Sequence, residues 1–160
     1  PGIGSFDFFI KNLKEFGFYS YLSNRENFRN QTLLGICLGM QVLGNSSQEG
    51  SLKGLGLIEG NNIKFDSKLT KVPNIGWHYA QLLKDNNKLS YFSQEDQRFY
   101  FCHSYHFSTD DENVVAKSFN GEEYNSIIKH PELNIYGFQF HPEKSHNFGI
   151  NLLKSILDEA

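Results

Sequence analysis

One cysteine stands between two glycines at the end of a short apolar run, in Gly35-Ile36-Cys37-Leu38-Gly39. The run from Thr32 to Ile36 is too short for a helix and predicts a buried strand. The residues after it, to Gly44, change to helical spacing. A sharp strand-to-helix turn of this form, a nucleophile elbow, lifts a side chain out at the carboxyl end of a strand in an α/β sheet. The flanking glycines are expected to avoid Cβ clashes in the tight turn.

The same turn would place Cys37 at a helix N-terminus. Backbone N–H groups there favour an anion, so we expect a lowered thiol pKa and donors for an oxyanion. A small buried cysteine beside packing glycines is the alternative, because free cysteine is among the most buried residue types. The pentapeptide alone leaves both interpretations open.

A second polar cluster follows the apolar run Ile135 to Phe140, in His141-Pro142-Glu143-Lys144. Pro142 disfavours the α region for His141, so the segment is predicted to stay extended. Residues two apart in an extended chain project to the same side, which would bring Glu143 to the imidazole. This pair is the base and its orienting carboxylate in a catalytic triad. A solvated surface turn is the alternative, since five other histidines occur.

The rest of the chain predicts one mixed α/β domain. A helical pattern from Phe6 to Phe18 is closed by Gly17, and a weaker one runs from Ser20 to Asn30. A closing amphipathic helix is predicted over Phe148–Leu157. Short strands are predicted at residues 62–65, 74–80, 98–107, 114–119, 124–128 and 135–140.

Composition excludes several classes of protein. The net charge is −3 and no basic block occurs, so a nucleic-acid partner is not expected. No apolar run reaches the roughly 18 residues that span a bilayer, so no membrane association is expected. Two cysteines favour a reducing compartment, and a cytoplasmic location is predicted. His103 and His106, with Cys102 and His141, match no common zinc spacing, so no metal is expected.

Over essentially all 160 residues, the chain resembles the class I glutamine amidotransferase family, and within it the glutaminase subunits of imidazole glycerol phosphate synthases. The resemblance rests on several motifs in the family's order: Pro1-Gly2-Ile3-Gly4-Ser5-Phe6, Leu34-Gly35-Ile36-Cys37-Leu38-Gly39-Met40-Gln41, Glu49-Gly50, Gly54-Leu55-Gly56, Val72-Pro73-Asn74-Ile75-Gly76-Trp77, His103-Ser104-Tyr105 and Gly137-Phe138-Gln139-Phe140-His141-Pro142-Glu143-Lys144-Ser145.

The resemblance implies a fold and a set of site residues. The fold is a flavodoxin-like sandwich with a mixed central sheet, and residues 1–160 form one glutaminase domain. The family has a strand–helix–strand region before Pro-Gly-x-Gly, which is missing from this sequence. No cofactor or metal is implied. The implied site consists of the triad Cys37, His141 and Glu143, the oxyanion hole Ile3, Gly4 and Leu38, the substrate-binding residues Gln41, Glu49, Ser104 and Tyr105, and the partner-interface residues Trp77, Tyr100 and Lys144.

The implied activity is hydrolysis of L-glutamine to glutamate and ammonia, with low activity in isolation. The ammonia would pass to a TIM-barrel cyclase subunit in a heterodimer that serves histidine biosynthesis. One alternative is ammonia supply for sugar amidation in bacterial surface polysaccharides, toward which Tyr100–Phe107 and Ser145–Gly149 lean. Two others are a stand-alone cysteine hydrolase, such as a γ-glutamyl hydrolase, and a non-catalytic regulatory subunit.

Overall fold

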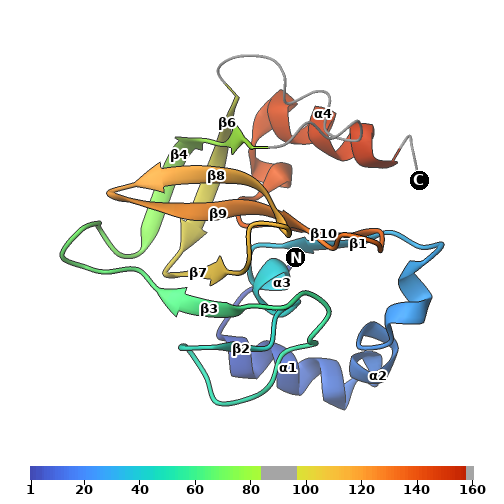
Figure 1. The fold of residues 1–160 in the computed structure, drawn as a ribbon. Coiled ribbons are helices and arrows are strands. Elements are labelled where there is room, and N and C mark those ends of the chain that lie inside the picture. Colours follow the sequence, from blue (N-terminus) through green and yellow to red (C-terminus); the bar gives the residue numbers. More distant parts are fainter. Residues whose placement is uncertain (84–96, 158–160) are drawn as a thin grey trace.

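The computed structural model describes residues 1–83 and 97–157, and within them the strands form three sheets (Figure 1). In the five-stranded central sheet, β1 and β10 are parallel and the other neighbours are antiparallel. The predicted mixed central sheet is therefore confirmed. In spatial order its strands are β1 (Leu33–Ile36), β10 (Ile135–Phe138), β9 (Glu122–Lys129), β8 (Val114–Asn120) and β5 (Gln81–Leu82).

Two smaller sheets stand beside the central one. The first contains β2 (Ser46–Ser47), β3 (Asn61–Lys64) and β7 (Tyr105–Ser108), and the second contains β4 (Asn74–Tyr79) and β6 (Arg98–His103). The predicted single strand 98–107 is wrong: it is interrupted at Ser104, β6 pairs with β4, and β7 pairs with β3. The chain changes sheets at Ser104, and this irregular backbone lies where the two small sheets meet.

The helices are short except at the two ends of the chain. The chain forms α1 (Phe6–Glu15), α2 (Phe18–Leu22), the 3₁₀ turn η1 (Arg25–Phe28), α3 (Leu38–Gln41), the 3₁₀ turn η3 (Pro142–Lys144) and α4 (His146–Leu157). Gly17, with φ of 77°, separates α1 from α2. The predicted helix from Ser20 to Asn30 is wrong as a continuous element, because the Asn24 side chain accepts the Glu26 N–H and starts η1. No described helix is long and apolar enough to cross a bilayer.

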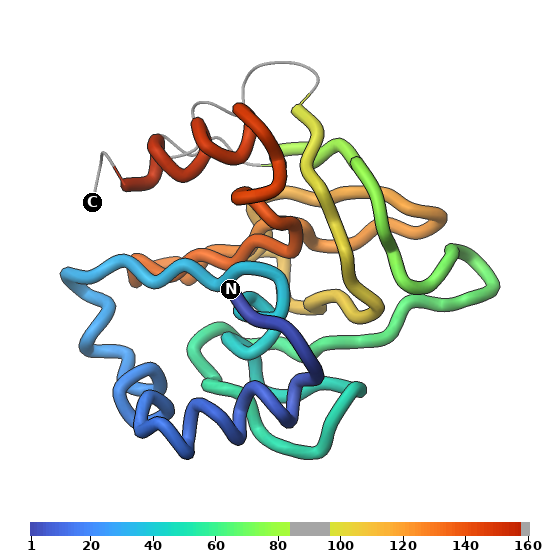
Figure 2. The backbone as a smooth tube through the Cα atoms, turned by 180° about the vertical axis from the view of Figure 1, so that it is seen from behind, coloured from blue at the N-terminus to red at the C-terminus, as the bar shows by residue number. Residues whose placement is uncertain are grey.

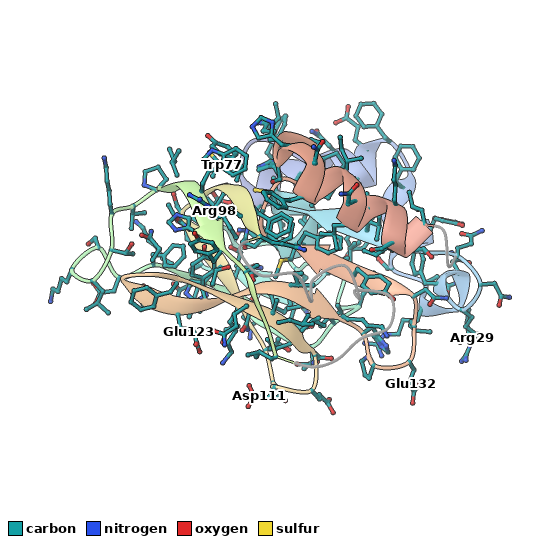
Figure 3. All side chains as sticks on the ribbon, turned by 90° about the horizontal axis from the view of Figure 1, so that it is seen from above. Arg29, Trp77, Arg98, Asp111, Glu123 and Glu132 are labelled. Atoms are coloured by element: carbon teal, nitrogen blue, oxygen red, sulfur yellow. The ribbon has the colours of Figure 1, made fainter. Side chains whose placement is uncertain are left out.

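Hydrophobic clusters cover both faces of the β1–β10 pair. Tyr136 and Phe138 pack on the α4 side, whereas Ile135 packs on the side of α1 and α3. Figure 2 shows α1 and α4 on opposite sides of this pair. Most of the largest fully buried side chains are phenylalanine or tyrosine, so the high aromatic content mainly serves the core. Charged side chains project outward from the layers (Figure 3), among them Arg29, Asp111, Glu123 and Glu132.

The two glycines of the elbow have different roles. A Cβ at Gly35 would lie 2.6 Å from the Gly39 carbonyl oxygen and 2.9 Å from the Met40 Cα, whereas a Cβ at Gly39 would meet nothing closer than 3.8 Å. The expectation that both glycines avoid clashes is therefore wrong for Gly39. We predict that Gly35→Ala lowers the free energy of unfolding by about 1–3 kcal/mol, as overpacking does, and that Gly39→Ala changes it much less. Urea unfolding of both variants tests this, and equal losses would contradict it.

Candidate active site

Cys37 occupies the turn between β1 and α3 in a strained conformation. Its φ of 54° and ψ of −108° are rare for any residue except glycine. Its N–H donates to the Phe138 carbonyl of β10 at 2.7 Å, and its own carbonyl accepts the N–H groups of Met40 and Gln41. These bonds hold the turn against the strain. The elbow predicted from the sequence is confirmed, and the alternative of an ordinary buried cysteine does not account for this backbone.

His141 follows β10 and contacts Glu143 directly. The backbone of His141 is extended, as predicted, with φ of −101° and ψ of 95°. The prediction that the segment continues extended is wrong, because Pro142–Lys144 forms the 3₁₀ turn η3. Proline suits the first position of such a turn, where no N–H is needed. The turn folds the Glu143 carboxylate back, and its Oε1 lies 2.7 Å from His141 Nδ1. The predicted contact is therefore correct, although its geometry is different.

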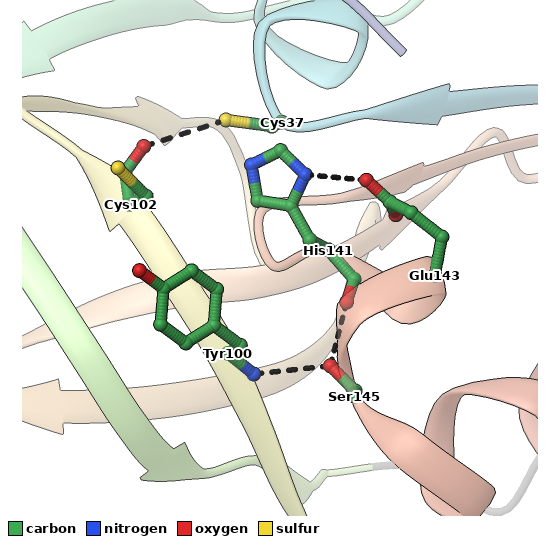
Figure 4. A network of polar contacts seen from close by, with 6 residues as sticks. All are labelled: Cys37, Tyr100, Cys102, His141, Glu143 and Ser145. Carbon is green, nitrogen blue, oxygen red and sulfur yellow. Dashed lines mark hydrogen bonds and ion pairs between the residues drawn. The ribbon is translucent and has the colours of Figure 1, made fainter.

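Ser145 fixes His141 to the neighbouring strand β6. The His141 N–H donates to the Tyr100 carbonyl at 2.9 Å. The fully buried Ser145 hydroxyl accepts the Tyr100 N–H at 3.0 Å and donates to the His141 carbonyl at 2.6 Å (Figure 4). Sequence reasoning missed this role of Ser145. The available signal was a serine four residues after His141, a spacing at which the hydroxyl can bond the backbone carbonyl.

A cavity of about 350 Å³ collects most of the predicted site residues. Figure 4 shows the His141 ring between Cys37 and Glu143. Glu143 lies behind the ring and is not part of the lining, and Trp77 and Tyr100 lie outside the cavity. The predicted residues that line it are Ile3, Gly4, Cys37, Leu38, Gln41, Glu49, Ser104, Tyr105, His141 and Lys144, and Gly2, Pro73, Cys102 and His103 line it in addition.

Comparison with known proteins agrees with this geometry. Residues 15–159 match the profile of the family described as glutamine amidotransferase class-I. The chain belongs to this family. It is 44% identical over 162 residues to imidazole glycerol phosphate synthase subunit HisH 2 of Methanococcus maripaludis, an alignment that covers 100% of the chain and 79% of the relative. It is 40% identical to the HisH subunit of Leptospira interrogans, covering 98% of the chain and 78% of that relative.

Solved structures support the amidotransferase fold. A glutamine amidotransferase from Thermotoga maritima superposes with a TM-score of 0.61 at 18% identity, covering 99% of the chain and 61% of that protein. The structure of PurLQS from the same organism gives 0.61 at 22% identity, covering 82% of the chain and 63% of the matched chain. The chain thus spans less than two thirds of both solved structures, and at these identities they establish the fold alone.

The surroundings of Cys37 disfavour its thiolate form. Burial raises the pKa of Cys37 to about 11, although the Leu38 N–H at the start of α3 opposes the shift. The expected lowering of the Cys37 pKa is therefore wrong: α3 has only four residues, and desolvation outweighs its N-terminal amides. The protonated Sγ donates to the Cys102 carbonyl at 3.7 Å.

The two predicted substrate-binding side chains are both held by the protein. The buried Gln41 directs its Nε2 to the Tyr105 carbonyl at 2.8 Å. Glu49 Oε2 accepts the Phe6 N–H at 2.8 Å, at the first residue of α1. Each side chain lines the cavity with its orientation already fixed, which lowers the entropy lost when a ligand binds.

The three predicted interface residues lie together at the edge of the site. The rings of Trp77 and Tyr100 meet edge to face with centroids 5.9 Å apart. Lys144 Nζ lies 6.0 Å from the Tyr100 ring centroid. Trp77 also stacks on His146 at 5.1 Å. These three residues adjoin the cavity, since Lys144 is part of its lining.

Two histidines near the site are buried: His103, which lines the cavity, and His106 on β7. Burial lowers the pKa of His103 to about 3, and burial also lowers the pKa of His106. The ring of His103 is satisfied by Asn74 and by the Tyr105 carbonyl. In residues 1–83 and 97–157, no three histidine, cysteine, aspartate or glutamate side chains are placed to hold a metal ion.

These histidines predict acid sensitivity. Their ordinary pKa is about 6.5, and a folded-state pKa below that value means that the unfolded chain binds more protons. The stabilisation is therefore complete above pH 6.5 and is lost as the pH falls toward 3. For His103 the loss between pH 7 and pH 5 is about 2 kcal/mol. Urea unfolding at pH 5, 6 and 7 measures it. His103→Gln should flatten the dependence, and the exposed His146→Asn should leave it unchanged.

Proposed function

We propose that this chain is the glutaminase subunit of imidazole glycerol phosphate synthase, hydrolysing L-glutamine to glutamate and ammonia. The observation that carries the proposal is the convergence of a strained cysteine and a carboxylate-bound histidine on one cavity. The names of the relatives supply the synthase, and they do not favour sugar amidation or a stand-alone hydrolase. No cofactor takes part in the proposed reaction.

In the proposed mechanism, His141 acts as the general base. Glu143 occupies Nδ1 at 2.7 Å, so the neutral ring carries its proton there and its Nε2 can accept a proton. The Cys37 sulfur attacks the side-chain amide carbon of glutamine while its proton moves to Nε2. Because the pKa of the buried thiol is about 11, attack and proton transfer are coupled. Glu143 stabilises the imidazolium that results.

The second half of the reaction returns the proton. The imidazolium of His141 protonates the amide nitrogen, the C–N bond breaks, and ammonia leaves a γ-glutamyl thioester on Cys37. His141 then takes a proton from water, the hydroxide attacks the thioester, and glutamate leaves as the sulfur regains its proton. The same ring therefore serves as base, acid and base again.

The proposed oxyanion hole consists of backbone N–H groups. Leu38 supplies one, next to the nucleophile, and the Ile3–Gly4 segment supplies the other across the cavity. Gly4 has φ of 95°, a conformation that suits glycine. A single donor of this kind is worth about 3 kcal/mol of barrier in measured enzymes. Gln41 and Glu49 hold the amino-acid end of the substrate, together with the backbone of Ser104 and Tyr105.

Ammonia must be kept from water, because protonation removes its nucleophilicity. We therefore propose that a TIM-barrel cyclase subunit covers Trp77, Tyr100 and Lys144 in a cytoplasmic heterodimer. Exposed apolar side chains on β4 support this choice of docking surface. The side chains of Ile75, Trp77 and Tyr79 are 57%, 42% and 51% exposed. Alternate residues of a strand share one face, so the three form a continuous patch of the kind that proteins use for docking.

Co-expression with the cyclase subunit tests the proposal. We expect slow glutamate formation by the chain alone and at least a tenfold increase with the partner, measured together with growth of a histidine auxotroph that lacks the glutaminase subunit. Trp77→Ala should lower the affinity for the cyclase subunit by about tenfold or more, as loss of a central aromatic side chain does at an interface. Phe18→Ala, which removes an exposed aromatic on α2, is the matched control. Glutamine hydrolysis at the full rate without a partner would contradict the proposal that the cyclase subunit activates this chain.

A further inference from the structure

Two carboxylates form hydrogen bonds between the start of α1 and the loop that follows β2, one from each side. Glu49 on the loop accepts the Phe6 N–H on the helix at 2.8 Å. Asp7 on the helix accepts the Ser51 N–H with both oxygens at 3.0 Å, and the Leu52 N–H at 3.0 Å. The Ser51 hydroxyl adds a bond to Asp7 at 3.2 Å. We call these contacts the carboxylate clasp.

The clasp joins two walls of the cavity. Glu49 forms one wall, and the Ile3–Gly4 segment, which directly precedes α1, forms another. The Ile3 side chain is 88% exposed, so it does not anchor this segment. Ser5 is the N-cap of α1 but makes no side-chain capping bond. Glu49 therefore caps the helix in its place and ties the loop to the start of the helix.

The loop lies so close to Asp7 that a side chain at position 50 would require the Asp7 carboxylate to move. A Cβ at Gly50 would lie 2.0 Å from Asp7 Oδ1 and 2.5 Å from its Cγ. The N–H groups of Leu52 and Ser51 also lower the pKa of Asp7. The carboxylate is therefore ionised at neutral pH, and its bonds to these amides are charge-assisted.

We infer that Asp7 is a positioning residue that holds Glu49 in place to receive the α-ammonium group of the substrate. The inference rests on the proposed glutaminase function. A carboxylate offers about four acceptor positions, so Glu49 can keep its bond to Phe6 and accept the ammonium as well. Asp7 reaches the substrate only through this loop. Without Asp7, the loop keeps the bonds of Glu49 to Phe6 and Ser47 but loses the bonds of Ser51 and Leu52 that hold it against α1.

Alkylation of Cys37 by two reagents tests the inference. A chloroketone analogue of glutamine needs the amino-acid site, whereas iodoacetamide needs only the sulfur. Peptide mapping separates Cys37 from Cys102. For Asp7→Ala we expect alkylation by the chloroketone to slow about tenfold, the scale of a lost charged hydrogen-bond set, and the iodoacetamide rate to stay unchanged. Glu15→Ala, which removes an exposed carboxylate at the other end of α1, should change neither rate.

The outcomes separate this inference from the proposed function. If wild type reacts no faster with the chloroketone than with its analogue that lacks the amino group, the glutaminase proposal fails. If wild type discriminates and Asp7→Ala discriminates equally well, the role of Asp7 is overturned. If Asp7→Ala slows alkylation by the chloroketone and by iodoacetamide equally, the role of Asp7 is also overturned, since Cys37 itself would then be disturbed.

Gly50→Ala gives a second, independent variant. Its methyl group would displace the Asp7 carboxylate, so it should slow the chloroketone reaction about as much as Asp7→Ala does. Because Asp7→Ala removes the atoms that the methyl would meet, the double variant should be no slower than the slower single variant. Losses that add in the double variant would overturn the inference.

Discussion

Replacement of Cys37 by alanine should reduce glutamine hydrolysis by about 10⁴-fold or more, because the proposed mechanism forms its thioester on the Cys37 sulfur. In the proposed mechanism, the strained backbone of Cys37 presents this sulfur to the substrate. Since alanine has no larger side chain to fit, the fold should be retained. Glutamate formation by the complex with its partner measures the loss.

Cys102→Ala is the matched control for this experiment. Cys102 lines the same cavity, but it contacts the Cys37 sulfur through its main-chain carbonyl, which alanine keeps. Its turnover should stay within about threefold of wild type, as expected for a residue that makes no bond in the transition state. A large loss in Cys102→Ala together with residual turnover in Cys37→Ala would reverse the assignment of the nucleophile.

Replacement of His141 by asparagine should lower turnover by about 10³-fold to 10⁴-fold, the scale for removal of a triad base. Because the Cys37 pKa is about 11, the thiol does not ionise unaided at neutral pH. The variant should therefore regain rate as the pH approaches 11, whereas wild type gains little there. The ratio of the two rates between pH 7 and pH 10 measures the contribution of the base.

His130→Asn is the control for the histidine. His130 accepts the N–H groups of Glu132 and Leu133 through Nδ1, and an asparagine oxygen can accept the same bonds. Its turnover should equal that of wild type at every pH. If His141→Asn instead kept full activity with an unchanged pH profile, another group would be the base.

Much of the site could be predicted from local sequence. The elbow at Cys37 follows from an apolar strand followed by helical spacing. The His141–Glu143 contact was also predicted, although the turn η3 brings the carboxylate back rather than an extended chain. Such patterns depend on residues within a few positions of one another. The strands predicted at the positions of β1, β3, β4, β8, β9 and β10 agree with the structure to within two residues at each end, whereas the two-residue strands β2 and β5 were not predicted.

Two of the errors arose where distant contacts decide the outcome. Residues 98–107 look like one strand, but β4 and β3 pair with its two halves separately and break it at Ser104. The pKa of Cys37 depends on how much protein covers the sulfur, and the short α3 could not offset that desolvation. Neither effect has a local signature.

Local patterns predict Cys37 as the nucleophile, His141 as its base and a mixed α/β fold, because each prediction rests on short-range backbone restrictions and on the alternation of apolar residues. Contacts between distant parts of the folded chain account for the raised pKa of Cys37, the bonds by which Ser145 holds His141, and the carboxylate clasp between Asp7 and Glu49. These depend on which groups meet after the chain has folded. Partners more than 40 residues apart, such as Asp7 and Leu52, are brought together by burial of the core, which no local pattern records.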